Sequence, residues 1–175
     1  MSRQKEVVFN GRVVRVAVES HRLPDGREAA FEIVHHPGGA AVLPVLDDGR
    51  VLLIRQFRPA AGGMLLEIPA GRLEDKEAPE ICAERELAEE VGYRPGRLEP
   101  LGTTLSSAGF CDERIYLFLA RRLEPVPAAP EPDEFIEPVP LPLAEALGLV
   151  AAGTIIDAKT QLALLLYRQA HLPPE

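Results

Sequence analysis

The chain has 175 residues, which is enough for one domain with a sizeable core. Its formal net charge is −8, and this argues against a nucleic-acid or anionic-membrane binder, because both of those partners are polyanions. Cys82 and Cys111 are too few for a disulfide framework and lack the spacing of a zinc site. No apolar run suits a secretory signal or a membrane span, so the expected location is the cytoplasm.

The first half of the chain predicts short strands separated by turns. Apolar and β-branched residues dominate Val13–Val18, Phe31–His35, Ala40–Leu46, Val51–Phe57 and Leu65–Ile68. Leu23-Pro24-Asp25-Gly26 has the chemistry of a tight turn, so the first two segments are expected to form an N-terminal β-hairpin. Asp47-Asp48-Gly49-Arg50 joins the next two segments and predicts a second hairpin. A loop is expected over Pro69–Ala78.

The second half predicts further strands among three helices. Pro79 suits the first residue of a helix and Gly92 its end, which predicts a helix over Pro79–Val91. Strands are expected at Thr103–Leu105, Arg114–Ala120 and Ile136–Val139, with an exposed proline-rich loop at Glu124–Pro132. A helix is expected over Pro142–Ala152. Asp157 is expected to cap a last helix that runs to about Ala170, and its predicted apolar face consists of Ala158, Leu162, Leu165 and Leu166. This order predicts a mixed α/β (α+β) domain.

Three carboxylates gather on the helix predicted over Pro79–Val91. At about 100° per residue, Glu86 and Glu90 share one face and Glu89 lies one step further round. They lie beside an apolar stripe that consists of Ala83, Leu87 and Val91. An ion pair between Arg85 and Glu89 would offset only part of the repulsion. Crowded carboxylates on a rigid element are typical ligands of Mg²⁺ or Mn²⁺, and the alternative is a solvated acidic face.

The segment Gly71–Tyr93 resembles the Nudix box. That motif reads G, five residues, E, seven residues, REU, one residue, EE, one residue, GU, where U is bulky and apolar. The fixed positions are all matched, by Gly71, Glu77, Arg85, Glu86, Leu87, Glu89, Glu90 and Gly92. Only Tyr93 departs from the motif, because an aliphatic residue is usual there.

Segments on both sides of the box resemble the ADP-ribose pyrophosphatase branch of that family. The matching segments are His36-Pro37-Gly38, Arg55-Gln56-Phe57-Arg58-Pro59, Leu66-Glu67-Ile68-Pro69-Ala70-Gly71, Gly109-Phe110-Cys111-Asp112-Glu113 and Asp157-Ala158-Lys159-Thr160. One departure concerns the substrate, because this chain has Ala108 where the branch usually has a proline.

The resemblance implies the Nudix fold, a mixed β-sheet core sandwiched between helices with an N-terminal β-hairpin. Residues 1–38 would form the hairpin region, which is part of the dimer and of the substrate site, and residues 39–175 the Nudix hydrolase domain. The implied assembly is a homodimer in which Val13 and Phe31 of one chain help build the adenine pocket of its partner. The alternative is that both side chains fill the core of their own hairpin.

The implied activity is metal-dependent hydrolysis of the pyrophosphate bond of ADP-ribose or a related nucleoside diphosphate sugar, which gives a nucleoside monophosphate and a sugar phosphate. Mg²⁺, with Mn²⁺ as a substitute, would neutralise the phosphates and activate the attacking water. The expected metal ligands are the Ala70 carbonyl, Glu86, Glu89 and Glu90. Arg85 would orient these carboxylates, whereas Glu77 would support the helix and its loop.

A carboxylate on another loop is expected to act as the general base. Glu134 is the first candidate, and Glu131 and Asp133 follow it; the alternative for Glu134 is a solvated loop acid. The residues expected to bind substrate are Arg55, Arg58, Glu67, Glu74, Glu113, Val13 and Phe31. The alternative for Arg58 is a surface salt bridge, and His35 and His36 are expected to be structural.

Two rival functions differ from nucleotide-sugar hydrolysis. One is cleavage of another nucleoside diphosphate conjugate, such as a flavin dinucleotide or a dinucleoside polyphosphate. The other is a non-catalytic regulator of the Nudix fold that only binds a nucleotide. Regulators of this kind usually lose box glutamates, whereas this chain keeps Glu86, Glu89 and Glu90. Binding to nucleic acid or to a membrane is not expected.

Overall fold

The structure is a computed structural model that describes residues 5–130 and 134–171. The chain divides into two compact units, which are considered separately below. The first unit comprises residues 1–38 and 105–114, and the second comprises residues 39–104 and 115–175.

The first unit contains a three-stranded antiparallel sheet. Its strands lie in the order β1 (Lys5–Asn10), β2 (Arg15–Arg22) and β3 (Glu28–His35). The turn between β2 and β3 has a positive φ at Gly26, and the Leu23 N–H donates to the Arg27 carbonyl at 2.7 Å. The predicted N-terminal hairpin is therefore confirmed. β1 is an additional strand that the sequence pattern did not predict.

Backbone hydrogen bonds attach the loop 105–114 to the end of β3. The Val34 N–H donates to the Phe110 carbonyl at 2.7 Å, and the Asp112 N–H donates to the Val34 carbonyl at 3.0 Å. The Ser107 carbonyl accepts the N–H groups of both Phe110 and Cys111. His35 lies between two carboxylates, 2.7 Å from Glu19 and 2.5 Å from Asp112. These contacts support the expectation that His35 has a structural role.

The second unit is built on two sheets. One has the order β7-β4-β9-β8 and consists of β4 (Gly39–Pro44), β7 (Ala70–Arg72), β8 (Tyr93–Leu105) and β9 (Arg114–Pro125). The other has the order β10-β5-β6 and consists of β5 (Val51–Arg58), β6 (Gly63–Glu67) and β10 (Ile136–Leu141). A short 3₁₀ helix, η1 (Pro59–Ala61), lies between β5 and β6. β4 and β9 are parallel, whereas β5 runs antiparallel to both of its neighbours.

The prediction of a second hairpin was wrong. The chain does turn at Gly49, which has a φ of 85°, but β4 and β5 belong to different sheets. A single bridge between Val45 and Val51 connects the two segments. Both strands are apolar on both faces, so alternation could not indicate which strand pairs with which.

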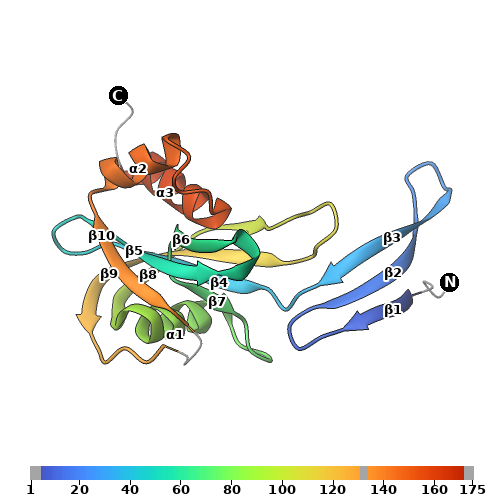
Figure 1. The fold of residues 1–175 in the computed structure, drawn as a ribbon, viewed down its shortest axis with the longest axis horizontal. Helices are drawn as coiled ribbons and strands as arrows, with labels where there is room; N and C mark the ends of the chain where they lie inside the picture. Colours follow the sequence, from blue (N-terminus) through green and yellow to red (C-terminus); the bar gives the residue numbers. More distant parts are fainter. Residues whose placement is uncertain (1–4, 131–133, 172–175) are drawn as a thin grey trace. The chain divides into compact units, whose positions relative to one another are not determined.

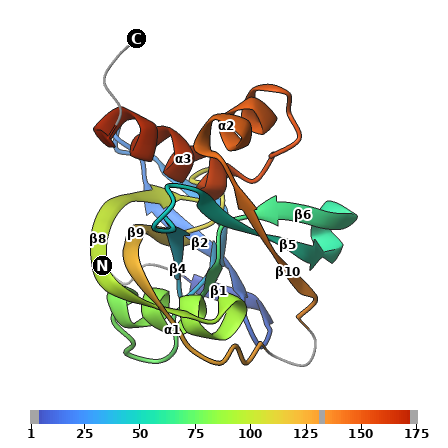
Figure 2. The same cartoon turned by 90° about the vertical axis from the view of Figure 1, so that its left-hand side faces the viewer.

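Three helices cover the strands of the second unit from two sides. α2 (Leu143–Ala151) and α3 (Ala158–His171) lie on one side, and α1 (Pro79–Val91) lies on the other (Figures 1 and 2). Successive residues of β4 alternate between them: Leu43 packs in the cluster that contains α2 and α3, whereas Val42 packs in the cluster that contains α1. This confirms a mixed sheet core between helices.

The helix ends follow the predicted signals. α1 has the predicted bounds, and its last turn ends at Gly92, which has a φ of 72°. A Cβ at Gly92 would also lie 2.8 Å from the Val126 carbonyl oxygen. Both the positive φ and this close approach therefore require glycine at the position. Asp157 caps α3 as predicted, because its Oδ2 accepts the Thr160 N–H at 3.0 Å.

The predicted apolar face of α3 was partly wrong. Ala158 and Leu165 are exposed, whereas Leu162 and Leu166 are half-buried. The fully buried side chains are Thr160, Ala163 and Leu164. Because α3 has apolar residues on more than one side, its sequence does not decide which side faces the sheet. The hydrogen bond from the Ile68 N–H to Thr160 turns the Thr160 side of α3 toward the β6–β7 connection.

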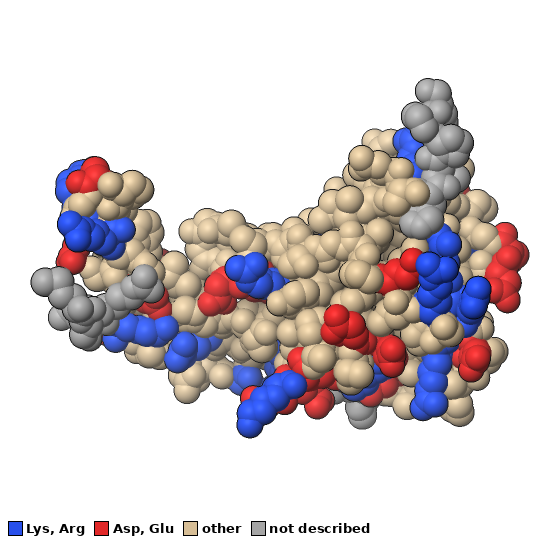
Figure 3. Space-filling model, turned by 180° about the vertical axis from the view of Figure 1, so that it is seen from behind, with Lys and Arg blue, Asp and Glu red and all other residues tan. Residues whose placement is uncertain are grey.

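The surface carries charges of both signs. On the face shown in Figure 3, Lys and Arg are interspersed with Asp and Glu, and they do not gather into one large basic patch. Within the part of the chain that the structure describes, no helix is both long and apolar enough to cross a membrane.

Candidate active site

The start of β7 packs against the acidic face of α1. The Ala70 N–H donates to Glu90 Oε2 at 3.0 Å. A Cβ placed on Gly71 would lie 1.7 Å from Glu86 Oε1, which is far inside any permitted contact. The Glu86 carboxylate can therefore approach the backbone only because residue 71 has no side chain.

Glu86 and Glu90 are buried carboxylates whose negative charges repel each other. Their residues are 6% and 3% exposed. Burial raises the pKa of Glu86 to about 7, although Arg85 opposes this shift. Burial and then repulsion from Glu86 raise the pKa of Glu90 to about 9. Among the described residues, Glu90 Oε1 is a buried oxygen without a hydrogen-bond partner. A cation placed here would stabilise both ionised groups.

Arg85 connects the carboxylates around α1. Its Nη1 donates to Glu86 at 2.7 Å and to Glu89 at 3.0 Å, which confirms the predicted Arg85–Glu89 pair. Its Nε and Nη2 donate to the two oxygens of Glu77 at 2.9 and 3.1 Å. Glu77 also accepts the Glu74 N–H at 3.0 Å. Glu77 thus supports the helix and its loop, as predicted.

The predicted metal ligands are only partly brought together. Glu86, Glu90 and the backbone of Ala70 are neighbours, whereas Glu89 is turned toward Arg85 and its side chain is 40% exposed. Over residues 5–130 and 134–171, no three His, Cys, Asp or Glu side chains form a metal cluster. The two buried carboxylates still offer the hard oxygen donors that a divalent cation takes, and the lone Glu90 Oε1 fits that use.

Glu134 lies close enough for its charge to act on the same pair. It precedes β10, and its charge contributes to the raised pKa values of both Glu86 and Glu90. The pairing of β10 with β5 fixes this approach, because the Phe57 N–H donates to the Phe135 carbonyl at 3.3 Å. The other two candidate bases, Glu131 and Asp133, lie outside the described residues.

Arg58 pairs with a buried carboxylate. Its Nε and Nη2 donate to the two oxygens of Glu67 at 2.8 and 3.2 Å. Glu67 is 1% exposed, so this pair is not the surface salt bridge considered as the alternative. Lys159 donates to the same carboxylate and, at 3.0 Å, to Asp157. Lys159 was not among the predicted site residues, although it belongs to the matching segment Asp157-Ala158-Lys159-Thr160.

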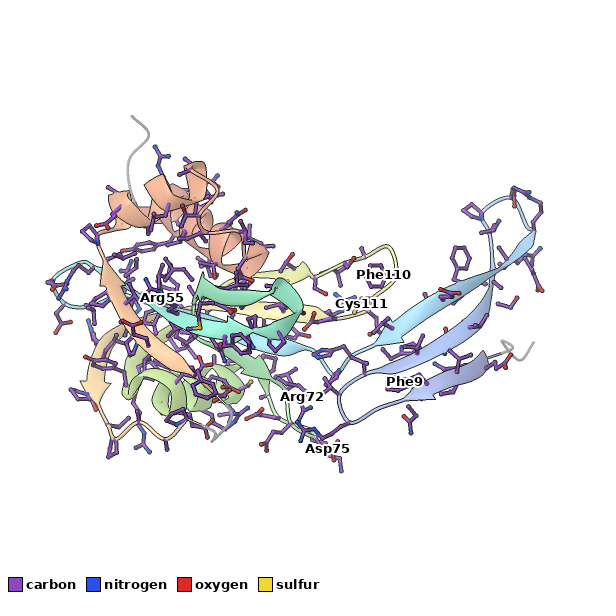
Figure 4. All side chains as sticks on the ribbon, viewed as in Figure 1. Phe9, Arg55, Arg72, Asp75, Phe110 and Cys111 are labelled. Atoms are coloured by element: carbon purple, nitrogen blue, oxygen red, sulfur yellow. The ribbon has the colours of Figure 1, made fainter. Side chains whose placement is uncertain are left out.

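The other residues expected to bind substrate are Arg55, Glu74, Val13, Phe31 and Glu113. Arg55 extends from β5 and is 3.4 Å from Glu137 on β10 (Figure 4). Glu74 is exposed in the loop before α1. The remaining three, Val13, Phe31 and Glu113, belong to the first unit. Val13 and Phe31 are each 40% exposed, so they do not fill a core of their hairpin. Their roles in binding stay predictions.

Replacing Glu86 with glutamine should stabilise the metal-free chain near pH 8 by about 1–3 kcal/mol, because one pKa unit corresponds to about 1.4 kcal/mol. The folded-state pKa of Glu86 is raised from 4.5 to about 7, so the folded chain binds the proton more tightly than the unfolded chain does. Stability is therefore lost as the pH rises through this range. Glutamine does not titrate, and its advantage should vanish near pH 4.

Urea unfolding in EDTA at both pH values measures this difference. Glu84→Gln is the matched control, because Glu84 is exposed on the same helix and its replacement should change stability by no more than about 0.5 kcal/mol. Equal stabilities of the parent and Glu86→Gln near pH 8 would contradict the conclusion that ionised Glu86 destabilises the metal-free fold.

Comparisons with known proteins identify the family of the chain. Residues 35–162 match the NUDIX domain. The ADP-ribose pyrophosphatase of Bacillus subtilis (strain 168) is 42% identical over 162 residues, which cover 91% of this chain and 88% of that protein. The methanol dehydrogenase activator of Bacillus methanolicus is 38% identical over 91% of this chain and 87% of its own length. The GDP-mannose pyrophosphatase of Yersinia pestis (strain Pestoides F) is 39% identical over 82% of this chain and 76% of its own.

A solved structure supports the fold. The crystal structure of an ADP compounds hydrolase superposes with a TM-score of 0.82 over 97% of this chain and 94% of that chain, at 22% identity. The domain match, the three relatives and the packing of Gly71 against Glu86 lead to one conclusion: this chain belongs to the Nudix family.

Proposed function

We propose that this Nudix enzyme hydrolyses the pyrophosphate bond of ADP-ribose or a related nucleoside diphosphate sugar, and releases a nucleoside monophosphate and a sugar phosphate. The buried Glu86–Glu90 pair beside Gly71 is the observation that carries this proposal. Two of the relatives are named as pyrophosphatases, of ADP-ribose and of GDP-mannose. They differ in base and in sugar but share a nucleoside diphosphate linked to a sugar.

Glu86, Glu90 and the carbonyl of Ala70 are the groups that would hold Mg²⁺, or Mn²⁺ in its place, with Glu89 as a further ligand. A divalent ion held by these groups would neutralise phosphate charge and would activate water. Arg85 restrains Glu86 and Glu89 through hydrogen bonds from its Nη1. The buried Glu90 Oε1, which lacks a partner among the described residues, supports this assignment.

Two further residues act on the substrate and on water. Glu134, whose charge reaches Glu86 and Glu90, is the proposed general base that takes a proton from the attacking water. Arg58 is proposed to contact the substrate phosphates, because its side chain is 38% exposed while its partner Glu67 is buried. Arg58 uses Nε and Nη2 for Glu67, so its Nη1 is not engaged in that pair.

Charge favours a diphosphate over a triphosphate. A diphosphate diester brings about two negative charges, which a divalent ion and Arg58 can offset, whereas a triphosphate brings about four. The loop that carries Ala108 lacks the usual proline, and alanine restricts the backbone less than proline does, so the loop would hold the terminal sugar less tightly. Selection for one sugar is proposed to be relaxed, so several sugars should be accepted.

A homodimer is proposed as the working assembly. The first unit exposes several large apolar side chains, namely Val7, Val8, Phe9, Val13, Phe31 and Phe110, and two of them are labelled in Figure 4. A soluble monomer rarely leaves so many apolar groups uncovered on so small a sheet. Val13 and Phe31 are proposed to help form the adenine pocket of the partner.

A regulatory function is the second candidate. The relative from Bacillus methanolicus is named as an activator of another enzyme, and it is 38% identical to this chain. Sequence similarity to an activator does not exclude catalysis, and this chain keeps the three box glutamates Glu86, Glu89 and Glu90. We therefore propose hydrolysis, and a measurement of turnover distinguishes a hydrolase from a regulator that only binds nucleotide.

Activity should require Mg²⁺ or Mn²⁺, and Glu86→Gln or Glu90→Gln should lower kcat by about 100-fold or more, because a ligand matters at least as much as the groups that orient it. Release of nucleoside monophosphate is followed with and without EDTA. Glu84→Gln is again the control and should retain the parent's rate. Full turnover in EDTA, or near-normal turnover in both variants, would sink the proposed chemistry.

The preferred substrate should be a nucleoside diphosphate sugar. The measurement is kcat/KM across ADP-ribose, other ADP- and GDP-sugars, flavin adenine dinucleotide, diadenosine polyphosphates and nucleoside triphosphates, with each product identified. If a triphosphate or a diadenosine polyphosphate is preferred tenfold, which is about 1.4 kcal/mol in transition-state binding, the substrate class is wrong although the family stands.

The chain should have the mass of a dimer, twice 19.1 kDa, in light scattering at micromolar concentration. Val8→Glu places a charge on the exposed β1 and should yield the monomer. Ile156→Glu is the control, because Ile156 is 61% exposed in the second unit, and it should leave the mass unchanged. A monomeric parent would refute the dimer and leave the chemistry untouched.

A further inference from the structure

Two cations and two carboxylates meet where β5, β6 and the start of α3 converge. Arg58 comes from the end of β5 and Glu67 from the end of β6, while Asp157 caps α3 and Lys159 lies in its first turn. Glu67 is 1% exposed, and the side chains of Lys159 and Asp157 are 11% and 17% exposed. Arg58, at 38%, is the member of the cluster that reaches solvent.

The two cations restrain Glu67 from different directions. Its Oε1 accepts Arg58 Nε at 2.8 Å, and its Oε2 accepts both Arg58 Nη2 at 3.2 Å and the ammonium of Lys159. With Arg58 alone, the carboxylate could rotate and the planar fork of Arg58 would rotate with it. Lys159 removes that freedom, since Oε2 must meet the Lys159 ammonium on α3 while both oxygens meet the fork of Arg58.

Lys159 itself is fixed by the cap of α3. Its Nζ donates to Asp157 Oδ1 at 3.0 Å, while Asp157 Oδ2 accepts the N–H and hydroxyl of Thr160. Thr160 is fully buried, and its hydroxyl oxygen accepts the Ile68 N–H at 2.9 Å. The same helical turn therefore holds both the backbone beside Glu67 and the cation that faces its carboxylate.

We propose that Lys159 is a positioning residue for Arg58: acting through the buried Glu67 carboxylate, it sets the orientation in which Arg58 meets the diphosphate of the substrate. Glu67 thus contributes to substrate binding from within the protein rather than by touching the substrate. This inference rests on the proposed function, in which Arg58 contacts phosphate. The Lys159 side chain is 11% exposed, so it acts through Glu67 and does not itself meet the substrate.

A double-mutant cycle separates positioning from simple support of the fold. Lys159→Met keeps the length and apolar stem of the side chain but removes its charge. It should lower kcat/KM for ADP-ribose by about tenfold, because small misplacements of a substrate-orienting group are costly. In an Arg58→Gln background it should lower kcat/KM by no more than about twofold, since Arg58 is then absent. Lys159→Arg keeps the charge and should recover part of the loss.

A second readout does not depend on turnover. The Nε–H of Arg58 is hydrogen-bonded to Glu67, and ¹⁵N NMR can follow its exchange with water. The signal is assigned by its loss in Arg58→Gln. Lys159→Met should speed its exchange, whereas Gln169→Met, an exposed change on the same helix, should leave it as in the parent. Circular dichroism and the melting temperature confirm that each variant is folded.

The outcomes distinguish this inference from the proposed function. Loss of kcat/KM by the same factor in both backgrounds would show a structural role for Lys159 and overturn the inference. Unchanged exchange of the Arg58 Nε–H in Lys159→Met would overturn it as well, whatever the activity. A parent that hydrolyses none of the nucleoside diphosphate sugars refutes the proposed function alone, and the NMR result then decides whether Lys159 orients Arg58.

Discussion

The close approach of the Glu86 carboxylate to the backbone at Gly71 is the contact on which the rest of the site depends. Any side chain at residue 71 would occupy the space of that carboxylate. Once Glu86 lies there, Glu90 is brought to the Ala70 N–H one turn further along α1, and both acids are withdrawn from water. The raised pKa values of the pair follow from this burial, and so does its fitness to hold a cation.

β7, which begins with Ala70 and Gly71, and the short connection before it are held from both sides of the sheet. On one side, α1 supplies Glu86, Glu90 and the Cys82 thiol, which donates to the carbonyls of Gly71 and Arg72. From the other side, α3 supplies Thr160 to the Ile68 N–H. Between them, the Val42 N–H donates to the Pro69 carbonyl. Consecutive residues of a short connection are thereby fixed by separate elements, which suits a segment that must hold reacting groups rigidly.

Local features of this site were predictable and distant ones were not. The bounds of α1 and the shared face of Glu86 and Glu90 follow from helical spacing and end signals, which act over a few residues. The parallel pairing of β4 with β9 could not be predicted, because strands that are apolar on both faces do not specify a partner. Lys159 lies 92 residues from Glu67, and only the folded chain shows that the two meet.

The reach of α3 back to Ile68 also bears on how the protein is made. β5 cannot pair along one of its edges until β10 has been made, and the β6–β7 connection cannot bind Thr160 until α3 has been made; both partners follow α1 in the chain. When a nascent chain has emerged from the ribosome as far as α1, the surfaces of β4 and β5 that later become buried are still exposed to water. The site is completed only after α3 has been made, because α3 supplies Thr160 to Ile68 and Lys159 to Glu67.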